Sequence, residues 1–547
     1  MKHRCLAIVL SALMLLSSFV ATPLIKNVAS ATLWVNVKDQ AYIPGPPTNA
    51  NVSVNTGTST EASLAIDSLG RPHIAWTDNT GTSPVATDIF YAWWDGTNWV
   101  NAQGTIYNGS NANVSKTRLA SINPSLQLDS NDMPHIIWVD DTWGNNYEPA
   151  YIHWDPVDAR WEQDNDSSYD ATGNCRISPP GQINYYNPCL RLDSNNLPHV
   201  SMTMDDKGDR EIIYARLTAA GTTNWVSHNG TAWSGGGGMT AVIVSQTPGK
   251  DSEFSSLALD TNNRPHIAWQ DMNWGVAWEI AYVHSNGTNW LNAPGNIWTP
   301  NSPNVSNNTP ISIRPSLELD TNNRPHVAWS NMTASGNFDI FYVRWNGSSW
   351  VTVINVAYNG TNANITNNTG DSNTPSLELD SNNNPHISWS DNVWNSNFEI
   401  CYFYWNGSNW LCGNKQTYSP IDGTNVVVSA NSGASLKPYL VIDTADMPHI
   451  SWEDNTYDSN WEIMYVRLFF NMTGTFDLTK EVDVDGDLDF TDDTAPVRGG
   501  DTLTYRLNWS FDNPDSDPLR GAYITDAIPN GTTYIGGSAN PAIASYS

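Results

Sequence analysis

Acidic and aromatic side chains recur together at corresponding positions along this chain. In four places an Asp ends a strand-like segment, and a Trp follows three to seven residues later. The pairs are Asp140 with Trp143, Asp271 with Trp274, Asp391 with Trp394, and Asp454 with Trp461. Aromatic rings beside carboxylates suit sugars, which stack their C–H faces on the rings and hydrogen-bond through their hydroxyls. We therefore expect these residues to bind a ligand; the alternative is that the aromatics only pack loops together.

Histidine also recurs, each time directly after a Pro. The seven positions are His73, His135, His199, His266, His326, His386 and His449. One interpretation is a ring of metal ligands. However, a residue that is repeated in every unit meets a need of every unit, whereas a single metal site requires asymmetry. We therefore predict a structural role, in which a His such as His326 shares hydrogen bonds with Asp320 and Trp329.

These residues belong to a repeat that sets the architecture. The phrase "SLELDTNNRPHVAWS", which begins at Ser316, is one of seven similar copies spaced roughly 60 to 67 residues apart. Each copy holds four strand-like segments; a tight turn such as "TNNR" joins the first two. Four strands in each of seven units are typical of β-propeller blades. We predict an all-β chain with a seven-bladed propeller over residues 32–471.

The two ends of the repeat region complement each other. The seventh copy ends in "EIMYVRLFFNMTG" and lacks a fourth strand, whereas the segment "TLWVNV" near the N-terminus resembles an orphan fourth strand. We predict that residues 33–38 pair with the strand around Ile463–Leu468 and close the ring. Closure protects sheet edges that would otherwise promote aggregation.

Four cysteines follow the N-terminal segment. Cys175 and Cys189 flank one loop, and Cys401 and Cys412 flank "YFYWNGSNWL". If Asn406-Gly407 formed a two-residue hairpin turn, Cys401 would face Cys412 across two strands. We therefore expect disulfides, which would place the protein in an oxidising compartment.

Two hairpins carry a family resemblance. The segments "WDGTNW" at Trp94 and "WNGSSW" at Trp345 resemble degenerate Asp-box hairpins of the sialidase-like propeller superfamily, whose usual pattern is S-x-D-x-G-x-T-W. Asp95 and Gly96 are adjacent here, so the match is loose. A sialidase would need three converging arginines, and the resemblance does not extend to them.

The candidate arginines lie in the wrong place for a sialidase. Arg71, Arg264 and Arg324 each precede the repeated Pro in the short turn, on the face opposite the variable loops. We therefore expect little affinity for sialic acid.

The repeat stops near residue 472. The segments "GGDTLTYRLNWSFDNPDSDP" and "YITDAIPNGTTYIGGS" resemble domain of unknown function 11, found on prokaryotic surface proteins. The resemblance implies an immunoglobulin-like β-sandwich over residues 472–547. The later strands of that family are missing before Ser547, so we expect a truncated sandwich.

An acidic insert lies within this C-terminal region. Asp483, Asp485, Asp487 and Asp489 alternate as in calcium loops. Leu488 occupies the position at which an EF-hand loop has Gly, so the insert departs from that motif. A calcium site and a solvated acidic loop both remain open.

The N-terminus and the overall charge bear on location and partners. Lys2 and Arg4 precede an apolar run, and Ala29 and Ala31 form a cleavage-site pattern, so residues 1–31 resemble a secretory signal peptide. An uncleaved anchor is the alternative; no later segment is apolar and long enough to span a membrane. Lys and Arg number 25 against 55 Asp and Glu, for a net charge of −30, which disfavours nucleic acid and anionic lipid.

Three functions are compatible with these features. The favoured interpretation is a secreted or cell-surface binding and adhesion protein whose propeller recognises a glycan or another surface ligand. The chain contains no G-x-S-x-G or H-E-x-x-H motif, and no catalytic carboxylate pair can be chosen from repeated acids, so we do not favour an enzyme. The alternatives are a secreted glycan-processing enzyme of sialidase-like architecture and a structural surface-layer component.

Overall fold

The computed structural model describes residues 33–469 apart from short loop segments, together with the backbone of residues 475–483 and 504–512. The gaps in the first range are residues 45–47, 81–85, 118, 144–145, 170–174, 180–182, 235–241, 276, 301, 303, 308–309, 394–396, 420–425 and 457–459. The predicted signal peptide, residues 1–31, lies outside the described residues. Contacts separate Ser30–Asn471 as one compact unit from the remaining residues.

The first unit is a seven-bladed β-propeller, as predicted, and each blade is a four-stranded antiparallel sheet. The inner strands are β2 (Ser59–Ile66), β6 (Ser121–Leu128), β10 (Asn184–Leu192), β14 (Ser252–Leu259), β18 (Ser312–Leu319), β22 (Ser372–Leu379) and β26 (Ser435–Ile442). The second strands are β3 (Pro72–Asp78), β7 (Pro134–Asp140), β11 (Pro198–Asp206), β15 (Pro265–Asp271), β19 (Pro325–Met332), β23 (Pro385–Asp391) and β27 (Pro448–Asp454). The third strands are β4 (Asp88–Trp94), β8 (Glu148–Asp155), β12 (Asp209–Leu217), β16 (Glu279–Ser285), β20 (Phe338–Trp345), β24 (Glu399–Trp405) and β28 (Glu462–Phe469). The outer strands are β5 (Trp99–Val100), β9 (Arg160–Glu162), β13 (Trp225–Val226), β17 (Trp290–Leu291), β21 (Trp350–Val351), β25 (Trp410–Cys412) and β1 (Leu33–Val35).

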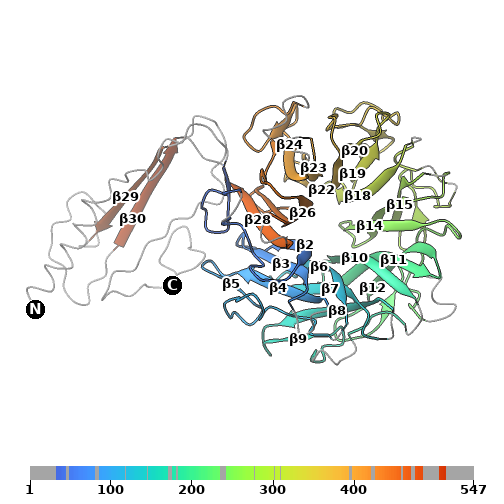
Figure 1. The fold of residues 1–547 in the computed structure, drawn as a ribbon, viewed down its shortest axis with the longest axis horizontal. Helices are drawn as coiled ribbons and strands as arrows, with labels where there is room; N and C mark the ends of the chain where they lie inside the picture. The colour runs from blue at the N-terminus through green and yellow to red at the C-terminus, as the bar shows by residue number, and fades with distance from the viewer. Residues whose placement is uncertain are drawn as a thin grey trace, which may run out of the picture. The chain divides into compact units, whose positions relative to one another are not determined.

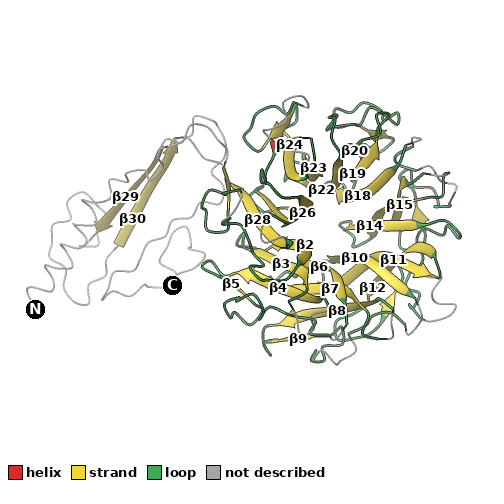
Figure 2. Ribbon diagram, viewed as in Figure 1, coloured by secondary structure: helices red, strands yellow, loops and turns green. Residues whose placement is uncertain are grey.

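The ring closes through the N-terminal strand. β1 pairs antiparallel with β28, with Leu33 opposite Phe469 and Val35 opposite Arg467. β1 is therefore the outer strand of the seventh blade, whose other strands are β26, β27 and β28. The predicted closure is confirmed, although the paired segment is 33–35 rather than 33–38. Strands dominate the described residues, joined by loops (Figure 2).

The repeated phrase is explained by the turn between the first two strands of each blade. In blade 5, Asp320 Oδ1 accepts hydrogen bonds at 2.8 Å from the backbone N–H groups of Asn322 and Arg324. Asn323 has a φ of 60°, a left-handed conformation that Asn tolerates better than most residues. Its side-chain amide donates to Thr261 Oγ1 in the turn of the preceding blade at 2.9 Å. Each turn thus fixes its own hairpin and links it to the next one.

The hydrophobic core lies between neighbouring blades. All seven residues of β3, β7, β15, β23 and β27 are buried. Each of these strands carries a Trp without exposed surface, for example Trp269 of β15. The core cluster around Trp329 combines Ala258 and Tyr282 of blade 4 with Val327 and Phe341 of blade 5. Each blade therefore depends on its neighbours for burial, as a repeat architecture requires.

The repeated histidines form a different network from the predicted one. In blade 5, His326 Nδ1 lies 2.6 Å from the hydroxyl of Tyr342, and Trp329 Nε1 donates to Asn331 instead of sharing a network with His326. The other pairs, at 2.6–2.7 Å, are His73 with Tyr91, His135 with Tyr151, His199 with Tyr214, His266 with Tyr282, His386 with Tyr402 and His449 with Tyr465. The predicted proximity to Asp is present in some blades, such as His449 Nε2 to Asp443 Oδ2 at 3.3 Å. The predicted His–Asp–Trp network is therefore divided into two: the His contacts a Tyr and, in some blades, the turn Asp, whereas the Trp donates to the residue two positions later.

The predicted disulfides are wrong. Cys175, Cys189, Cys401 and Cys412 are free. Residues 406–409 form a four-residue loop between β24 and β25, in which Asn406 N donates to Asn409 O, rather than the two-residue turn that we assumed. The longer loop shifts the register by two residues, so Cys412 faces Phe403 instead of Cys401. The other two cysteines pack in separate core clusters.

Outside the propeller, the structure describes two strands. β29 (Thr475–Asp483) pairs antiparallel with β30 (Thr504–Asp512). The predicted immunoglobulin-like sandwich is not shown by these two strands. Asp483 ends β29, and Asp485, Asp487 and Asp489 lie outside the described residues. Among the described residues, no helix has the length and apolar character needed to cross a membrane.

Candidate functional site

The aspartates that we expected to bind ligand are buried within their blades. Asp271 has no exposed surface; its Oδ2 accepts hydrogen bonds from Trp269 Nε1 at 2.8 Å and Ser252 Oγ at 3.1 Å, and its Oδ1 accepts from the Asn273 N–H at 2.7 Å. Burial raises the pKa of Asp271. The same three kinds of contact surround Asp140, Asp391 and Asp454. Because protein donors already occupy these oxygens, the carboxylates fasten the second strand to the first.

Three of the four associated tryptophans lie among the described residues, and they are partly buried. Trp143 packs against the core shared by blades 1 and 2. Trp274 donates from Nε1 to the carbonyl oxygen of Ser302 at 3.1 Å and meets the Trp298 ring edge-on at 6.1 Å. Trp461 is half-buried just before β28, and Trp394 lies outside the described residues. For Trp143 and Trp274, these contacts agree with the alternative that the aromatics pack loops.

A second row of acids, at the start of the third strands, is also engaged within the blades. Each carboxylate accepts a hydrogen bond from a Ser or Thr hydroxyl in a loop that leads to an inner strand. The pairs are Asp88 with Ser115, Glu148 with Ser178, Glu211 with Ser245, Glu279 with Ser306, Asp339 with Thr366, Glu399 with Ser429, and Glu462 with Ser53. Burial raises the pKa of Glu462 to about 6. Both rows of repeated acids therefore serve the fold, and a functional site must lie where the blades differ.

A β-bulge interrupts the inner strand of every blade, and the residue at this bulge varies among the blades. In blade 1 the register of β2 against β3 shifts between Thr60 and Ser63, and corresponding shifts interrupt the other six inner strands. One residue of every bulge has a positive φ between 50° and 58°, although none is Gly. The seven bulge residues are Glu61, Asn123, Asn187, Phe254, Arg314, Thr374 and Lys437. Bulges re-aim side chains and are common beside active sites, and a positive φ in a non-glycine residue is strained.

The seven bulge residues lie around the axis of the propeller, because the inner strands surround it (Figure 1). Contacts between neighbouring blades show that they form a ring: Lys437 Nζ is 3.9 Å from Glu61 Oε1, and the Arg314 guanidinium lies 4.6 Å from the Phe254 ring centroid. The residue that follows this position is Pro in five of the blades. The position itself is acidic, amide, aromatic, basic or hydroxyl. We call these residues the bulge ring.

Blades 7 and 1 bring two carboxylates and one ammonium group together in the bulge ring. Lys437 Nζ lies 3.3 Å from Glu453 Oε1 and 3.9 Å from Glu61 Oε1. Glu453 Oε2 accepts the Glu61 N–H at 3.1 Å, and Glu61 Oε2 accepts from Thr77 Oγ1 and the Asn123 N–H, both at 3.0 Å. The Glu453 side chain is 5% exposed, whereas the side chains of Glu61 and Lys437 are 27% and 45% exposed. Burial raises the pKa of Glu453, and Lys437 opposes that rise.

This acid pair is asymmetric in the propeller. The residues equivalent to Glu453 on the other second strands are Thr77, Val139, Thr203, Gln270, Ser330 and Ser390. Glu453 is thus the one acid in its row, and Glu61 is the one acid among the bulge residues. The two lie in adjacent blades, so the sequence places its two exceptional carboxylates side by side.

A cation and an aromatic ring occupy another part of the bulge ring. The Arg314 guanidinium stacks on Phe254, and the Arg314 N–H donates to Gln270 Oε1 at 3.0 Å. Burial lowers the pKa of Arg314, while the negative charges of Glu253 and Glu453 oppose this. Glu253 itself pairs with Arg210 and accepts from Gln270 Nε2. In the part of the chain that the structure describes, no carboxylate lies within 4.0 Å of the Arg314 guanidinium.

Sequence reasoning missed the bulge ring, although a signal was present. Five of the seven bulge residues are followed by Pro, as in Arg314-Pro315 and Lys437-Pro438. Proline inside a strand pattern marks a bulge or an edge, because it lacks the N–H that a ladder needs. That signal would have located the bulges, and the variable residue beside each Pro would then have stood out.

Comparison with known proteins gives likeness of fold alone. No family model matches the chain. No curated protein matches it either. Among solved structures, an ulvan lyase described as a new family of polysaccharide lyase is 12% identical, with 80% of this chain and 94% of that chain covered and a TM-score of 0.44. The polysaccharide lyase Uly1 is 10% identical, with coverages of 81% and 98% and a TM-score of 0.41. An α-L-arabinofuranosidase from Fusarium graminearum is 10% identical, with coverages of 80% and 98% and a TM-score of 0.37.

These neighbours correct the favoured functional interpretation. They are glycan-processing enzymes, and none of the three is an adhesion protein. The favoured interpretation of a binding and adhesion protein is corrected on that point: the neighbours are named as polysaccharide lyases and an arabinofuranosidase, and their likeness to this chain extends to the fold alone.

Proposed function

We propose that the propeller is a glycan-processing enzyme that cleaves glycosidic bonds at the bulge ring. The observation that carries this proposal is the asymmetric pair of Glu453 and Glu61, which share Lys437. Most glycosidases use two carboxylates that flank the scissile bond. The repeated acids could not supply such a pair, because their oxygens are engaged within every blade.

The two carboxylates have environments that suit different roles. Burial raises the pKa of Glu453, so this group retains a proton to higher pH than an ordinary Glu and can protonate the leaving-group oxygen. Glu61 is more exposed and is held in place by Thr77 and Asn123. Glu61 would attack the sugar carbon or activate a water molecule. Lys437 fixes the distance between the two groups by contacting both.

The remainder of the bulge ring supplies the means to hold a sugar chain. Phe254 offers an aromatic ring, although Arg314 stacks on one of its faces. Asn123, Asn187 and Thr374 offer hydrogen-bonding side chains at corresponding positions of other blades. These groups surround one axis, so a polysaccharide bound there can contact several blades at once.

A second reaction is favoured by Arg314. A guanidinium without a carboxylate within ion-pair distance can bind the carboxylate of a uronic acid, since Arg recognises carboxylates well. Neutralising that carboxylate acidifies the adjacent C–H bond and favours β-elimination. Lyase action on an acidic polysaccharide is therefore the alternative reaction for the same ring.

The test is a panel of neutral and uronate-containing polysaccharides incubated with the full chain and with a Glu61→Gln/Glu453→Gln double variant. New reducing ends measure cleavage, and ultraviolet absorbance of unsaturated products distinguishes elimination from hydrolysis. For the wild type, we expect new reducing ends without ultraviolet absorbance. In the double variant, the rate of cleavage should fall by at least about 100-fold. Absorbance would select the lyase alternative, while cleavage that survives the double substitution would refute the site.

The expectations about location and the C-terminal region also stand as proposals. We propose that residues 1–31 direct export, which would bring the enzyme to extracellular polysaccharides at the cell surface or beyond it. The β29–β30 pair is compatible with the start of an immunoglobulin-like sandwich resembling domain of unknown function 11. Detection of the mature N-terminus after residue 31 in the culture medium would support export, and an intact Met1 on a cytoplasmic protein would contradict it.

A further inference from the structure

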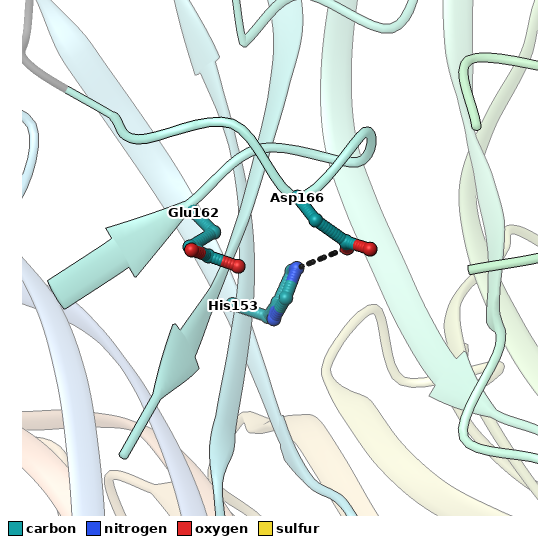
Figure 3. Close-up of side chains that lie close together, drawn as sticks. All are labelled: His153, Glu162 and Asp166. Atoms are coloured by element: carbon teal, nitrogen blue, oxygen red, sulfur yellow. Dashed lines mark ion pairs between the residues drawn. The ribbon is translucent and has the colours of Figure 1, made fainter. Parts of the chain in front are cut away.

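Blade 2 carries a cluster of potential metal ligands at its outer edge, away from the bulge ring. His153 lies on β8, Glu162 ends the outer strand β9, and Asp166 lies in the turn that follows. One ligand atom from each of the three side chains lies within 4.8 Å of those of the other two. Figure 3 shows the three side chains converging, with an ion pair between His153 Nε2 and Asp166 Oδ1 at 3.5 Å.

Glu162 is an exception among the outer strands. It pairs directly with His153 in the β8–β9 register. The residues at the same position of the other six blades are Val35, Val100, Val226, Leu291, Val351 and Leu411. The Glu162 side chain is 6% exposed, so blade 2 buries a carboxylate where every other blade has an aliphatic group. Burying a carboxylate is costly unless it is paired or coordinates a metal.

Asp166 lies at a turn position that varies among the blades: it is Asp39 in blade 7, Asn355 in blade 5 and Lys415 in blade 6, and Gly in the remaining three. The Asp166 N–H donates to the Gln163 carbonyl oxygen, a turn that Gly104 makes to Asn101 in blade 1 and Gly295 makes to Asn292 in blade 4. Asp166 has a φ of 58°, which glycine adopts without strain. The side chain is half exposed and reaches back to His153. Blade 2 therefore combines one departure from the pattern, Glu162, with a turn carboxylate that faces the same histidine.

Arg160 partly neutralises Glu162 but leaves one oxygen available. Its Nε and Nη2 atoms donate to Glu162 Oε1 at 2.9 and 2.6 Å, and Nη2 also lies 2.8 Å from Asp158 Oδ2. Both bonds to Glu162 end on Oε1, so Oε2 remains free for a further ligand. A simple ion-pair latch occurs at the same place in blade 7, between Arg467 and Asp39, without any third group. Blade 2 adds the carboxylate that such a latch does not require.

We propose that His153, Glu162 and Asp166 bind a divalent transition-metal ion, for which zinc is the probe. One imidazole and two carboxylates form a ligand set that suits zinc better than calcium or magnesium, which prefer oxygen ligands alone. Binding requires the His153 tautomer with an unprotonated Nε2, which would exchange its contact to the Gln163 carbonyl oxygen at 3.2 Å for the metal. The ion would tie β8, β9 and the following turn together. This site is independent of the proposed glycosidic cleavage.

The test uses substitutions that restore the residues of the other blades. The full chain is stripped with a chelator and titrated with zinc by isothermal calorimetry, alongside Glu162→Val and Asp166→Gly variants. Since Val and Gly stand at these positions elsewhere in the propeller, both variants should fold, which circular dichroism checks. We expect the wild type to bind one more zinc ion than either variant, and to gain melting temperature on zinc addition where the variants do not.

Further outcomes decide the proposal. Calcium or magnesium in place of zinc should produce no difference in melting-temperature shift between the wild type and the two variants. Zinc binding of equal stoichiometry and affinity in the wild type and in both variants would overturn the assignment. Absence of zinc binding to the wild type would overturn it too, and would leave the cluster as an ion-paired latch.

Discussion

Two sets of polar residues in the same propeller behave in opposite ways. In the repeated network, a Trp, a Ser and a backbone N–H converge on a buried Asp such as Asp271, with nearly the same geometry in blade after blade. In the bulge ring, the backbone geometry is repeated, since all seven residues have a φ near 50–58°, but the side chains vary, and only Asn occurs twice. The comparison teaches that uniform positions hold the blades together, whereas the constant bulge presents a side chain that is free to vary.

The same comparison explains why repeated acids were poor guides to function. A site that binds one ligand needs unlike groups at unlike positions, and sevenfold repetition supplies like groups. Glu453 and Glu61 are informative because each breaks its own row. Every blade has the strained positive φ at its bulge, so this backbone strain is a feature of the fold. A functional difference between blades must therefore come from the side chain at the bulge.

Removing one carboxylate of the repeated network should lower folding stability without lowering activity. Asp271→Ala leaves Trp269 Nε1, Ser252 Oγ and the Asn273 N–H without their acceptor, so we expect a loss of about 3 kcal/mol of folding stability. Urea unfolding measures the change. Polysaccharide cleavage by the folded fraction should remain close to that of the wild type. A stability change below about 0.5 kcal/mol would show that the network contributes little.

The His–Tyr pairs should make the propeller sensitive to acid. Burial lowers the pKa of His326 to about 3, so the folded state keeps this group neutral while the unfolded chain binds a proton below about pH 6.5. Stability is therefore lost as the pH falls from about 6.5 toward 3. A His326→Gln variant lacks this effect, although it is less stable at neutral pH because its contact with Tyr342 is altered.

The stability gap between wild type and His326→Gln should narrow by about 2 kcal/mol between pH 6.5 and pH 5. Urea unfolding at the two pH values measures it. A gap that stays constant would mean that His326 takes up a proton in the folded protein as readily as in the unfolded chain.

The smallest expected effect concerns substrate contact in the bulge ring. Phe254→Ala removes a ring on which a sugar can stack, worth about 1 kcal/mol, so KM should rise several-fold with little change in kcat. The Phe254 side chain is only partly buried, so the melting temperature should change little. A large fall in melting temperature with KM unaltered would place Phe254 with the structural residues instead.

The sequence was sufficient for the features that repeat. Period, turn chemistry and the orphan strand led to seven blades and to closure by residues 33–38, of which the structure pairs 33–35. Features that depend on register were not recoverable: one wrong loop length displaced Cys412 from Cys401 to Phe403. The pairing of His326 with Tyr342 spans 16 residues between two strands, and the sequence did not show which neighbour the imidazole would reach. Glu61 and Glu453 are 392 residues apart, and only ring closure brings them together.

The central claim is that the bulge ring carries the chemistry and the repeated acids carry the fold. Glu453→Gln and Glu279→Gln make the same chemical change at two buried glutamates. Glu453 contacts Glu61 and Lys437 of the bulge ring, and Glu279 belongs to the repeated row. The direct measurement is kcat/KM for polysaccharide cleavage together with the melting temperature of both variants. We predict that Glu453→Gln lowers kcat/KM at least about 100-fold and leaves the melting temperature nearly unchanged, whereas Glu279→Gln lowers the melting temperature and leaves kcat/KM within about threefold. Equal effects of the two substitutions on kcat/KM would contradict the account.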